Sequence, residues 1–161
     1  ARVEGVDPTT IDTDLVEVFN KIRTIAGNEN VNALDTGLGS VVYAVKPGDG
    51  SAREQAASCQ RVLGGIANIA KEYATKRYRS NLMNWGMIPF LLDEAPTFEI
   101  DDYIYVPNIK NILDGDMTKI PAYIIGKEVK EFNLHIADMT PDERKIVKAG
   151  CLINFNRNKI K

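Results

Sequence analysis

Cysteine is scarce in this chain of 161 residues, which contains only Cys59 and Cys151. Two cysteines are too few for a disulfide scaffold, for a four-cysteine zinc site or for the complete ligand set of an iron–sulfur cluster. Neither cysteine has the spacing of a metal ligand, so we expect no metal site in this chain. Cys59 falls within an expected helix, and we interpret it as a buried structural residue.

Histidine is scarcer still, with His135 alone. It falls in an expected strand over 129–136, where alternation places its side chain opposite to those of Leu134 and Ile136. We therefore interpret His135 as a surface or interface residue. No serine–histidine–aspartate triad can be assembled from this sequence.

Long apolar runs and an excess of one charge are also missing. No segment approaches the roughly 18 consecutive apolar residues of a membrane-spanning helix, and the formal net charge is only −2. We expect a soluble, cytoplasmic protein. The small net charge argues against a protein that binds nucleic acid by electrostatic attraction alone. The chain begins with Ala1, Arg2 and Val3 and lacks an apolar signal segment, so we expect a piece of a longer protein or a processed product.

What is present is an ordinary globular composition, with 44% apolar and 26% charged residues, enough for a core of its own. Residues 1–9 lack periodicity and are expected to form an irregular lead-in. Segment 66–85 favours a helix, with a short strand before it as an alternative. Elsewhere, spacing and capping residues predict three helices. The first is capped by Asp12 or Thr13 and stops near Gly27, the second covers 52–63 after a cap at Ser51, and the third runs from a cap at Thr140 to about Ala149. Strands are predicted over 41–45, 87–92, 103–106, 121–126 and 129–136. This interleaving predicts an α/β fold in one domain.

The most informative stretch runs from Gly48 through Gly50 and Ser51 to Arg53, between an expected strand and an expected helix. Glycines let the backbone approach a ligand, the start of a helix attracts anions, and a guanidinium binds carboxylate or phosphate. The stretch matches neither a Walker loop nor a nucleophile elbow. A simpler interpretation stays open at this point, in which Ser51 only caps the helix and Arg53 is a solvated residue of its first turn.

Three blocks of sequence resemble the aconitase family. They are GDGSAREQAA followed by RVLGG (48–65), SNLMNWGMIPF (80–90) and AGCLINFNR (149–157). The resemblance covers about residues 37–157. Within the family, this sequence is similar to a divergent hydratase branch. It implies a single swivelling domain of β/β/α type over 1–161, as in the C-terminal domain of aconitase and the small subunit of isopropylmalate dehydratase.

The same resemblance implies a hydro-lyase that dehydrates and rehydrates a hydroxy-di- or tricarboxylic acid. Ser51 would be the catalytic base, acting as an alkoxide, and Arg53 would support it or bind a substrate carboxylate, with Gly50 and the backbone of Ala52 also at the substrate. The family has a second serine where this chain has Ala52, which puts the usual substrate in doubt, and its histidine is replaced here by Gln55. A [4Fe–4S] cluster is expected in larger domains or a larger subunit absent from this chain.

Two alternatives accompany this interpretation: a separate small subunit of isopropylmalate dehydratase type, and an RNA-binding regulatory module. The second depends on a basic cluster with nearby aromatic residues, which equally fits a solvated helix face or the lining of a cleft; it comprises Lys76, Arg77, Arg79, Tyr73, Tyr78 and Trp85. The basic residues of 157–161 are interpreted as a frayed end. We further expect Ser51 and Arg53 on an exposed rim facing the cluster-bearing partner, and no hydratase activity from this chain alone.

Overall fold

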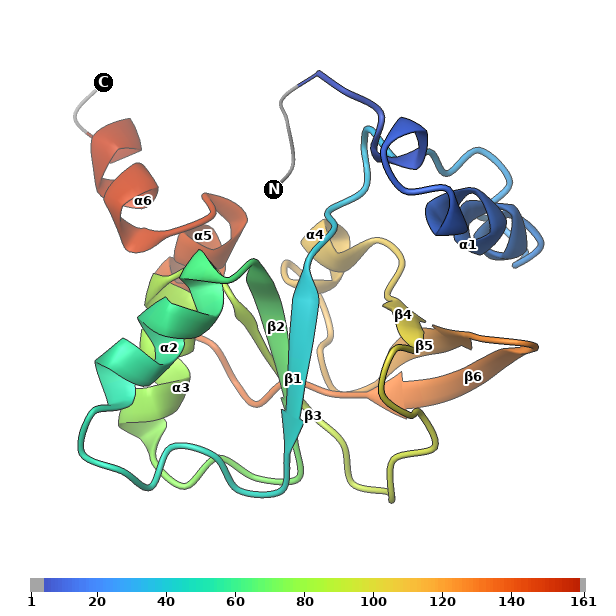
Figure 1. Cartoon of the computed structure of the whole chain (residues 1–161). Helices are drawn as coiled ribbons and strands as arrows, with labels where there is room; N and C mark the ends of the chain where they lie inside the picture. The colour runs from blue at the N-terminus through green and yellow to red at the C-terminus, as the bar shows by residue number, and fades with distance from the viewer. Residues whose placement is uncertain (1–4, 160–161) are drawn as a thin grey trace. The chain divides into compact units, whose positions relative to one another are not determined.

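The computed structural model describes residues 5–159, which form two compact units (Figure 1). The first unit takes its residues from three stretches, Ala1–Leu38, Pro96–Asn108 and Pro121–Asn133. The second takes Gly39–Ala95, Ile109–Ile120 and Leu134–Lys161. Helices and strands alternate along the chain, which confirms the predicted α/β class.

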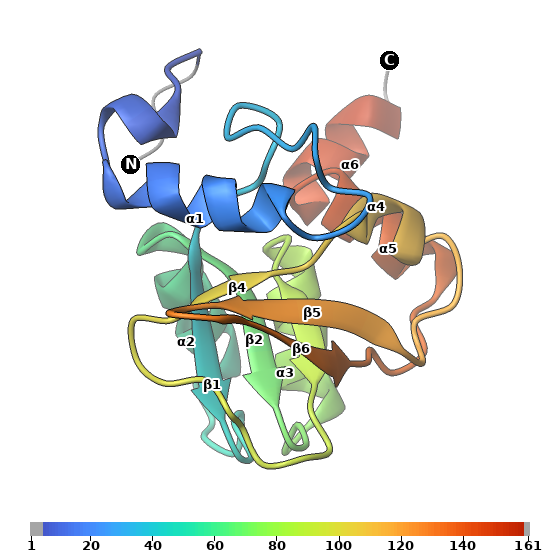
Figure 2. The same cartoon turned by 90° about the vertical axis from the view of Figure 1, so that its right-hand side faces the viewer.

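The first unit packs one helix against a three-stranded sheet (Figure 2). Its elements are η1 (Pro8–Thr10), α1 (Asp14–Arg23), β4 (Tyr103–Tyr105), β5 (Ile120–Ile125) and β6 (Val129–Leu134). The strand order is β4-β5-β6, with β4 antiparallel to β5. The apolar residues of α1 fall at helical spacing, so one face of the helix is buried, and they form a core with the sheet: Leu15, Phe19, Ile22, Ile25, Ala33 and Ile125.

Three expectations for this unit need correction. Part of the lead-in is ordered, because Asp7 Oδ1 accepts the backbone N–H of Thr9 at 2.9 Å and caps η1; residues 1–4 of the lead-in lie outside the described residues. Helix α1 ends at Arg23 rather than at Gly27, since the backbone already turns at Thr24 to Ile25. Strand β6 ends at Leu134, one residue before His135.

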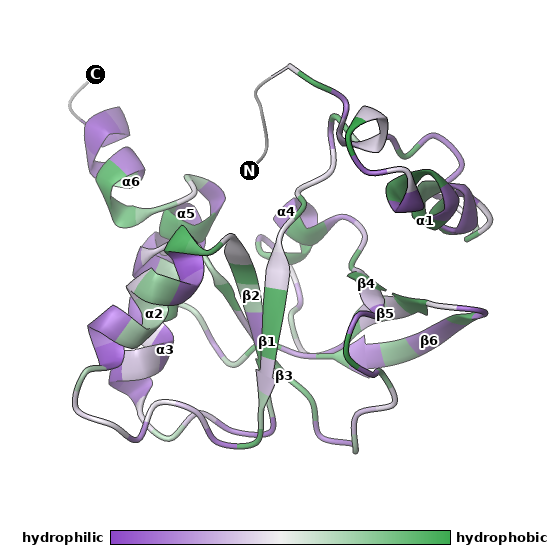
Figure 3. Cartoon of the chain, viewed as in Figure 1, coloured by the Kyte–Doolittle hydropathy of each residue, from purple (hydrophilic) through white to green (hydrophobic). Residues whose placement is uncertain are grey.

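The second unit contains a parallel sheet of order β1-β2-β3. Its strands are β1 (Ser40–Ala44), β2 (Gly65–Ala70) and β3 (Ile88–Leu91), and its helices are α2 (Arg53–Val62), α3 (Lys76–Asn84), α4 (Ile109–Ile112), α5 (Pro141–Lys148) and α6 (Leu152–Lys159). Helices α2 and α3 lie side by side on one face of this sheet (Figure 1). Figure 3 shows hydrophobic residues in β1 and β2 and many hydrophilic residues along α2 and α3. Because β1 is an edge strand, its residues are more exposed than those of β2.

The core beneath α2 and α3 joins residues of α2, of α3 and of the turn before β3, and Tyr73 and Trp85 pack against it; it comprises Ala57, Tyr78, Leu82 and Met87. Segment 66–85 therefore contains the strand-then-helix alternative. Gly86 follows α3 with φ +72°, and a Cβ added there would lie 1.8 Å from the carbonyl oxygen of Gly150. The turn after α3 thus approaches the turn after α5 too closely for any side chain.

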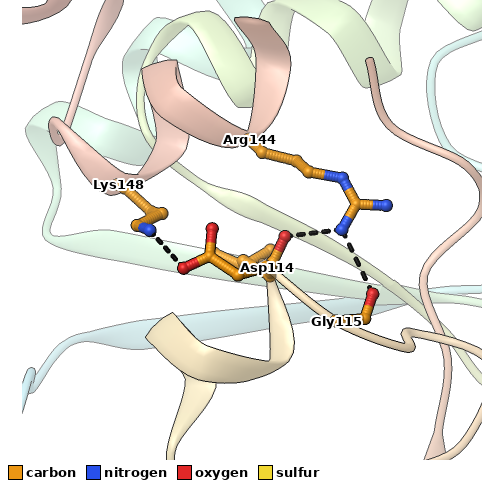
Figure 4. Close-up of polar contacts among 5 residues, drawn as sticks. Asp114, Gly115, Arg144 and Lys148 are labelled. Atoms are coloured by element: carbon orange, nitrogen blue, oxygen red, sulfur yellow. Dashed lines mark hydrogen bonds and ion pairs between the residues drawn. The ribbon is translucent and has the colours of Figure 1, made fainter. Parts of the chain in front are cut away.

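Helix α5 binds the end of the short helix α4 (Figure 4). Arg144 Nη1 donates to the carbonyl oxygens of Leu113 at 2.6 Å and Gly115 at 3.2 Å, and Lys148 forms an ion pair with Asp114. Basic side chains suit the exposed carbonyls at the end of a helix. The sequence does not predict α4, because a helix of four residues is too short to show hydrophobic periodicity.

Helix α6 was also missed, and it corrects the frayed-end interpretation. Arg157 and Lys159 belong to this helix, and Lys159 Nζ lies 4.2 Å from the centroid of the Phe155 ring. Residues 160–161 lie outside the described residues. Among the helices of 5–159, none is long and apolar enough to cross a membrane.

Candidate active site

The loop between β1 and α2 lies at the carboxyl edge of the parallel sheet (Figure 1). Open parallel sheets bind ligands at this edge, where the loops that follow neighbouring strands meet. Within the loop, residues 49–52 are exposed, while Gly48 and Arg53 are half-buried. The expected exposure of Ser51 is therefore observed, and its predicted role stays a prediction.

Ser51 does not cap α2, contrary to expectation. The helix begins at Arg53 and its N-cap residue is Ala52, whose side chain has no oxygen, so that no side chain caps the first turn. The first N–H groups of a helix have no intrahelical partner, and together they carry the positive end of the helix dipole. The Ser51 hydroxyl thus lies next to a helix start that remains available to an anion.

Arg53 is not a simply solvated residue. Its Nε donates to the carbonyl oxygen of Gly48 at 3.1 Å, and its Nη2 donates to that of Asp49 at 3.4 Å. The guanidinium therefore folds back over the loop and braces the turn that carries Ser51. A lysine could make only a point contact here, because it lacks the planar fork of donors.

Gly48 is required by both its backbone and its surroundings. Its φ is +95°, and a Cβ would lie 2.5 Å from Cβ and Cγ of Tyr78. Its carbonyl oxygen also accepts a hydrogen bond from Thr75 Oγ1 at 3.2 Å. The loop after β1 therefore rests on the first turn of α3.

The loops after β1 and β2 are joined along their length. The backbone N–H of Glu72 donates to Val45 O at 3.1 Å, and that of Ala74 donates to Pro47 O at 2.9 Å. Lys46 and Glu72 form an exposed ion pair with an Nζ–Oε1 distance of 2.8 Å, which raises the pKa of Lys46. This support from the β2–α3 loop was not predicted, although a threonine directly before a helical segment indicates a helix cap at Thr75.

His135 lies at the same edge of the sheet, beside the end of β3. It pairs with Leu91 through two backbone hydrogen bonds, N–H to O, of 3.0 Å and 2.7 Å. Its half-buried imidazole has Nδ1 3.6 Å from Oδ2 of Asp93. The chain's one histidine thus faces a carboxylate.

Comparison with known proteins places this chain in a family. The model of the aconitase C-terminal domain matches residues 25–95, which include the Ser51 loop. The homoaconitase small subunit of the methanogen Methanocaldococcus jannaschii is 32% identical over 158 residues, covering 90% of this chain and 84% of that protein. This chain belongs to the aconitase family.

Two longer relatives match a smaller share of their own length. An aconitase–ribosomal protein bL21m fusion protein of Schizosaccharomyces pombe is 30% identical over 118 residues, 70% of this chain and 13% of the fusion protein. The mitochondrial aconitate hydratase of Gracilaria gracilis is 36% identical over 72 residues, 43% of this chain and 9% of that enzyme. The chain therefore matches most of the length of one relative, a small subunit, and a small part of the length of the two others.

The residues of the basic cluster in α3 lie in different environments. Lys76 and Arg77 are exposed, whereas Tyr78 is buried. Arg79 Nη2 donates to the carbonyl oxygens of Ala137 at 2.6 Å and Asp138 at 2.9 Å, so that this arginine ties α3 to the segment before α5. The cluster is therefore not one solvated basic face.

The prediction of a buried Cys59 is wrong. Cys59 lies in α2 as expected but is exposed, and the buried position of that helix is Ala57, two residues earlier. Cys151 is half-buried. Across residues 5–159, no three side chains of histidine, cysteine, aspartate or glutamate are grouped so that they could hold a metal ion.

Proposed function

We propose that this chain provides the catalytic base and a carboxylate-binding arginine to an aconitase-type hydro-lyase. The substrate would be a hydroxy-di- or tricarboxylic acid, which loses water to give an unsaturated acid. The observation that carries the proposal is the exposure of Ser51 beside the uncapped start of α2, within the segment that matches the aconitase C-terminal domain.

A serine removes a proton from carbon only as an alkoxide, so its anion must be stabilised. The positive end of α2 and the nearby Arg53 guanidinium supply that stabilisation. In the dehydration direction, the proton on the carbon beside a carboxylate passes to Ser51 Oγ, the hydroxyl of the neighbouring carbon leaves, and a C=C bond forms. A [4Fe–4S] cluster in a larger partner would supply the Lewis acid for that hydroxyl.

The same loop would also bind the substrate. The backbone at Gly50 and Ala52 lies exposed at the start of α2, where an anionic carboxylate is stabilised. Arg53 bonds to the loop through two of its five guanidinium N–H groups, and the others would donate to a substrate carboxylate. Because Ala52 provides an N–H but no hydroxyl, we propose a substrate that makes one hydrogen bond fewer at this position than the usual substrate of the family.

A separate small subunit is the arrangement that one observation favours. The chain covers 84% of the homoaconitase small subunit of M. jannaschii, so the base would reach its cluster-bearing partner through association of two chains. Co-expression with the large subunit encoded in the same genome, followed by size-exclusion chromatography, tests this. Failure of the two chains to elute together would contradict a separate-subunit enzyme and favour a covalently joined one.

The activity test uses the reconstituted complex with citrate, homocitrate and 3-isopropylmalate as probes, monitoring ultraviolet absorbance of the unsaturated product. We expect turnover of one probe, and a loss of about 10²- to 10⁴-fold in kcat for Ser51→Ala, since a positioned base contributes that much. Ser58→Ala is the matched control, because its hydroxyl bonds only to Gln55 O in α2. Equal activity of the two variants, or turnover by this chain without its partner, would overturn the proposal.

A further inference from the structure

We infer that Thr75 is a positioning residue for Ser51, an inference that rests on the function proposed above. Its side-chain hydroxyl makes two hydrogen bonds at once. Oγ1 accepts the backbone N–H of Tyr78 at 3.2 Å, which caps α3, and donates to the carbonyl oxygen of Gly48 at 3.2 Å. One hydroxyl group therefore fixes both the start of α3 and the loop that carries the base.

The Gly48 carbonyl is the point at which this support meets the site. It accepts from Thr75 Oγ1 on one side and from Arg53 Nε, at 3.1 Å, on the other. Gly48 precedes Ser51 by three residues, and its α-carbon rests against the Tyr78 side chain. The Gly48 carbonyl thus connects the Arg53 guanidinium with the residue before α3, at the turn that Gly48 forms.

The surface on which Gly48 rests is itself held from below. Tyr78 Oη accepts hydrogen bonds from Gln60 Nε2 at 3.1 Å and from Asn68 Nδ2 at 3.2 Å. Asn68 lies in β2 and is 1% exposed. Thr75 therefore connects the loop to a helix turn whose tyrosine is hydrogen-bonded to residues of α2 and β2.

The two bonds of Thr75 can be separated by substitution. Serine keeps both the acceptor and the donor. Aspartate accepts the Tyr78 N–H and is a good N-cap residue, but as a carboxylate it has no proton to donate and repels the Gly48 carbonyl. Comparing Thr75→Ser with Thr75→Asp therefore isolates the bond to the loop from the cap of α3.

The test measures kcat of the complex with its cluster-bearing partner, together with amide hydrogen exchange of the free chain. For Thr75→Asp we expect a loss of about tenfold to a hundredfold in kcat, the cost of a small displacement of a catalytic group. Amide exchange should become faster at residues 49–54 and stay unchanged in α3, and Thr75→Ser should match the wild type in both measurements. Thr140→Asp is the matched control, since Thr140 caps α5 through Glu143 N and should leave kcat close to that of the wild type.

Two outcomes would overturn the inference. One is a Thr75→Asp variant that matches Thr75→Ser in kcat and in exchange of the loop. The other is faster exchange throughout α3, which would mean that Thr75 serves the helix alone. A wild-type complex without turnover of any probe would count against the proposed function instead, and the exchange comparison would still decide whether Thr75 holds the loop.

Discussion

Two helices of the second unit begin in opposite ways. At α5, Thr140 Oγ1 accepts the N–H of Glu143 at 3.2 Å, and Glu143 Oε2 accepts the N–H of Thr140 at 2.7 Å, with Pro141 at the first helical position. At α2, the N-cap residue is Ala52 and no side chain caps the first turn. An alanine in place of a capping residue costs about 1 kcal/mol. The side-chain cap thus stabilises α5, which has no proposed role at the site, and is absent from α2, which begins beside Ser51.

The two starts also differ in what supports them. Residues of α5 satisfy their own helix start, whereas the loop before α2 is held by Thr75 and Tyr78 from another part of the chain. Substitutions within the supporting β2–α3 segment should therefore disturb the start of α2, and only local substitutions should disturb the start of α5.

Gly48→Ala should have the largest effect on this comparison. The added methyl group would collide with the Tyr78 side chain, and the alanine backbone would have to keep an unfavourable positive φ. We therefore expect the free energy of unfolding to fall by about 2–4 kcal/mol. Gly50→Ala is the control, because a Cβ there meets nothing within 4 Å. Urea unfolding of both variants measures the difference, and similar midpoints would mean that the loop does not rest on Tyr78.

Tyr73→Phe should weaken the support in a way that depends on pH. Tyr73 donates its hydroxyl to Phe90 O at 3.0 Å, and burial strongly raises the pKa of this phenol. At neutral pH we expect a loss of about 1 kcal/mol with the hydrogen bond. Above about pH 10 the unfolded wild type releases the tyrosine proton while the folded state keeps it, so the wild type loses stability and the difference narrows.

Denaturant unfolding at pH 7 and in alkaline buffer measures this effect. Tyr43→Phe serves as the comparison, because Tyr43 is exposed in the edge strand β1. A constant difference between Tyr73→Phe and the wild type at both pH values would contradict a buried, neutral phenol in the folded state.

Thr140→Ala should remove the side-chain cap of α5 and half of its capping box. We expect a loss of about 1 kcal/mol in stability and no change in kcat of the complex, since this helix start does not border Ser51. Thermal unfolding and the activity assay measure the two quantities. Loss of activity beyond the loss of folded protein would show that α5 takes part in the site.

Ala52→Ser should have the smallest effect and the opposite sign. A hydroxyl at the N-cap position of α2 can accept a first-turn N–H, which should stabilise the protein by about 0.5–1 kcal/mol. The same hydroxyl occupies the helix start that we assign to a substrate carboxylate, so KM should change more than kcat. An unchanged KM for every probe would place the carboxylate elsewhere.

Local patterns predicted the parts of the fold that local interactions build. The capping box at Thr140 was read from the sequence, because its partners lie three residues apart. The spacing of apolar residues likewise located α1. Helix α4 was not predicted because four residues are too few to show a periodic pattern, and the bond of Arg144 to Leu113 that holds its end joins residues 31 positions apart. Burial of Cys59 was wrong because the face that α2 turns inward is set by packing against distant residues.

The sequence by itself determined the α/β class, the aconitase resemblance and the candidate pair Ser51 and Arg53, because glycines, caps and motif residues act within a few positions of one another. Only the tertiary structure decided that Ala52 rather than Ser51 is the N-cap residue of α2 and that Arg53 bonds back to its own loop. Thr75 and Gly48 are 27 residues apart, and they meet because parallel pairing of β1 with β2 brings the loops after both strands to one edge. A contact of that kind has no signature in the order of the residues.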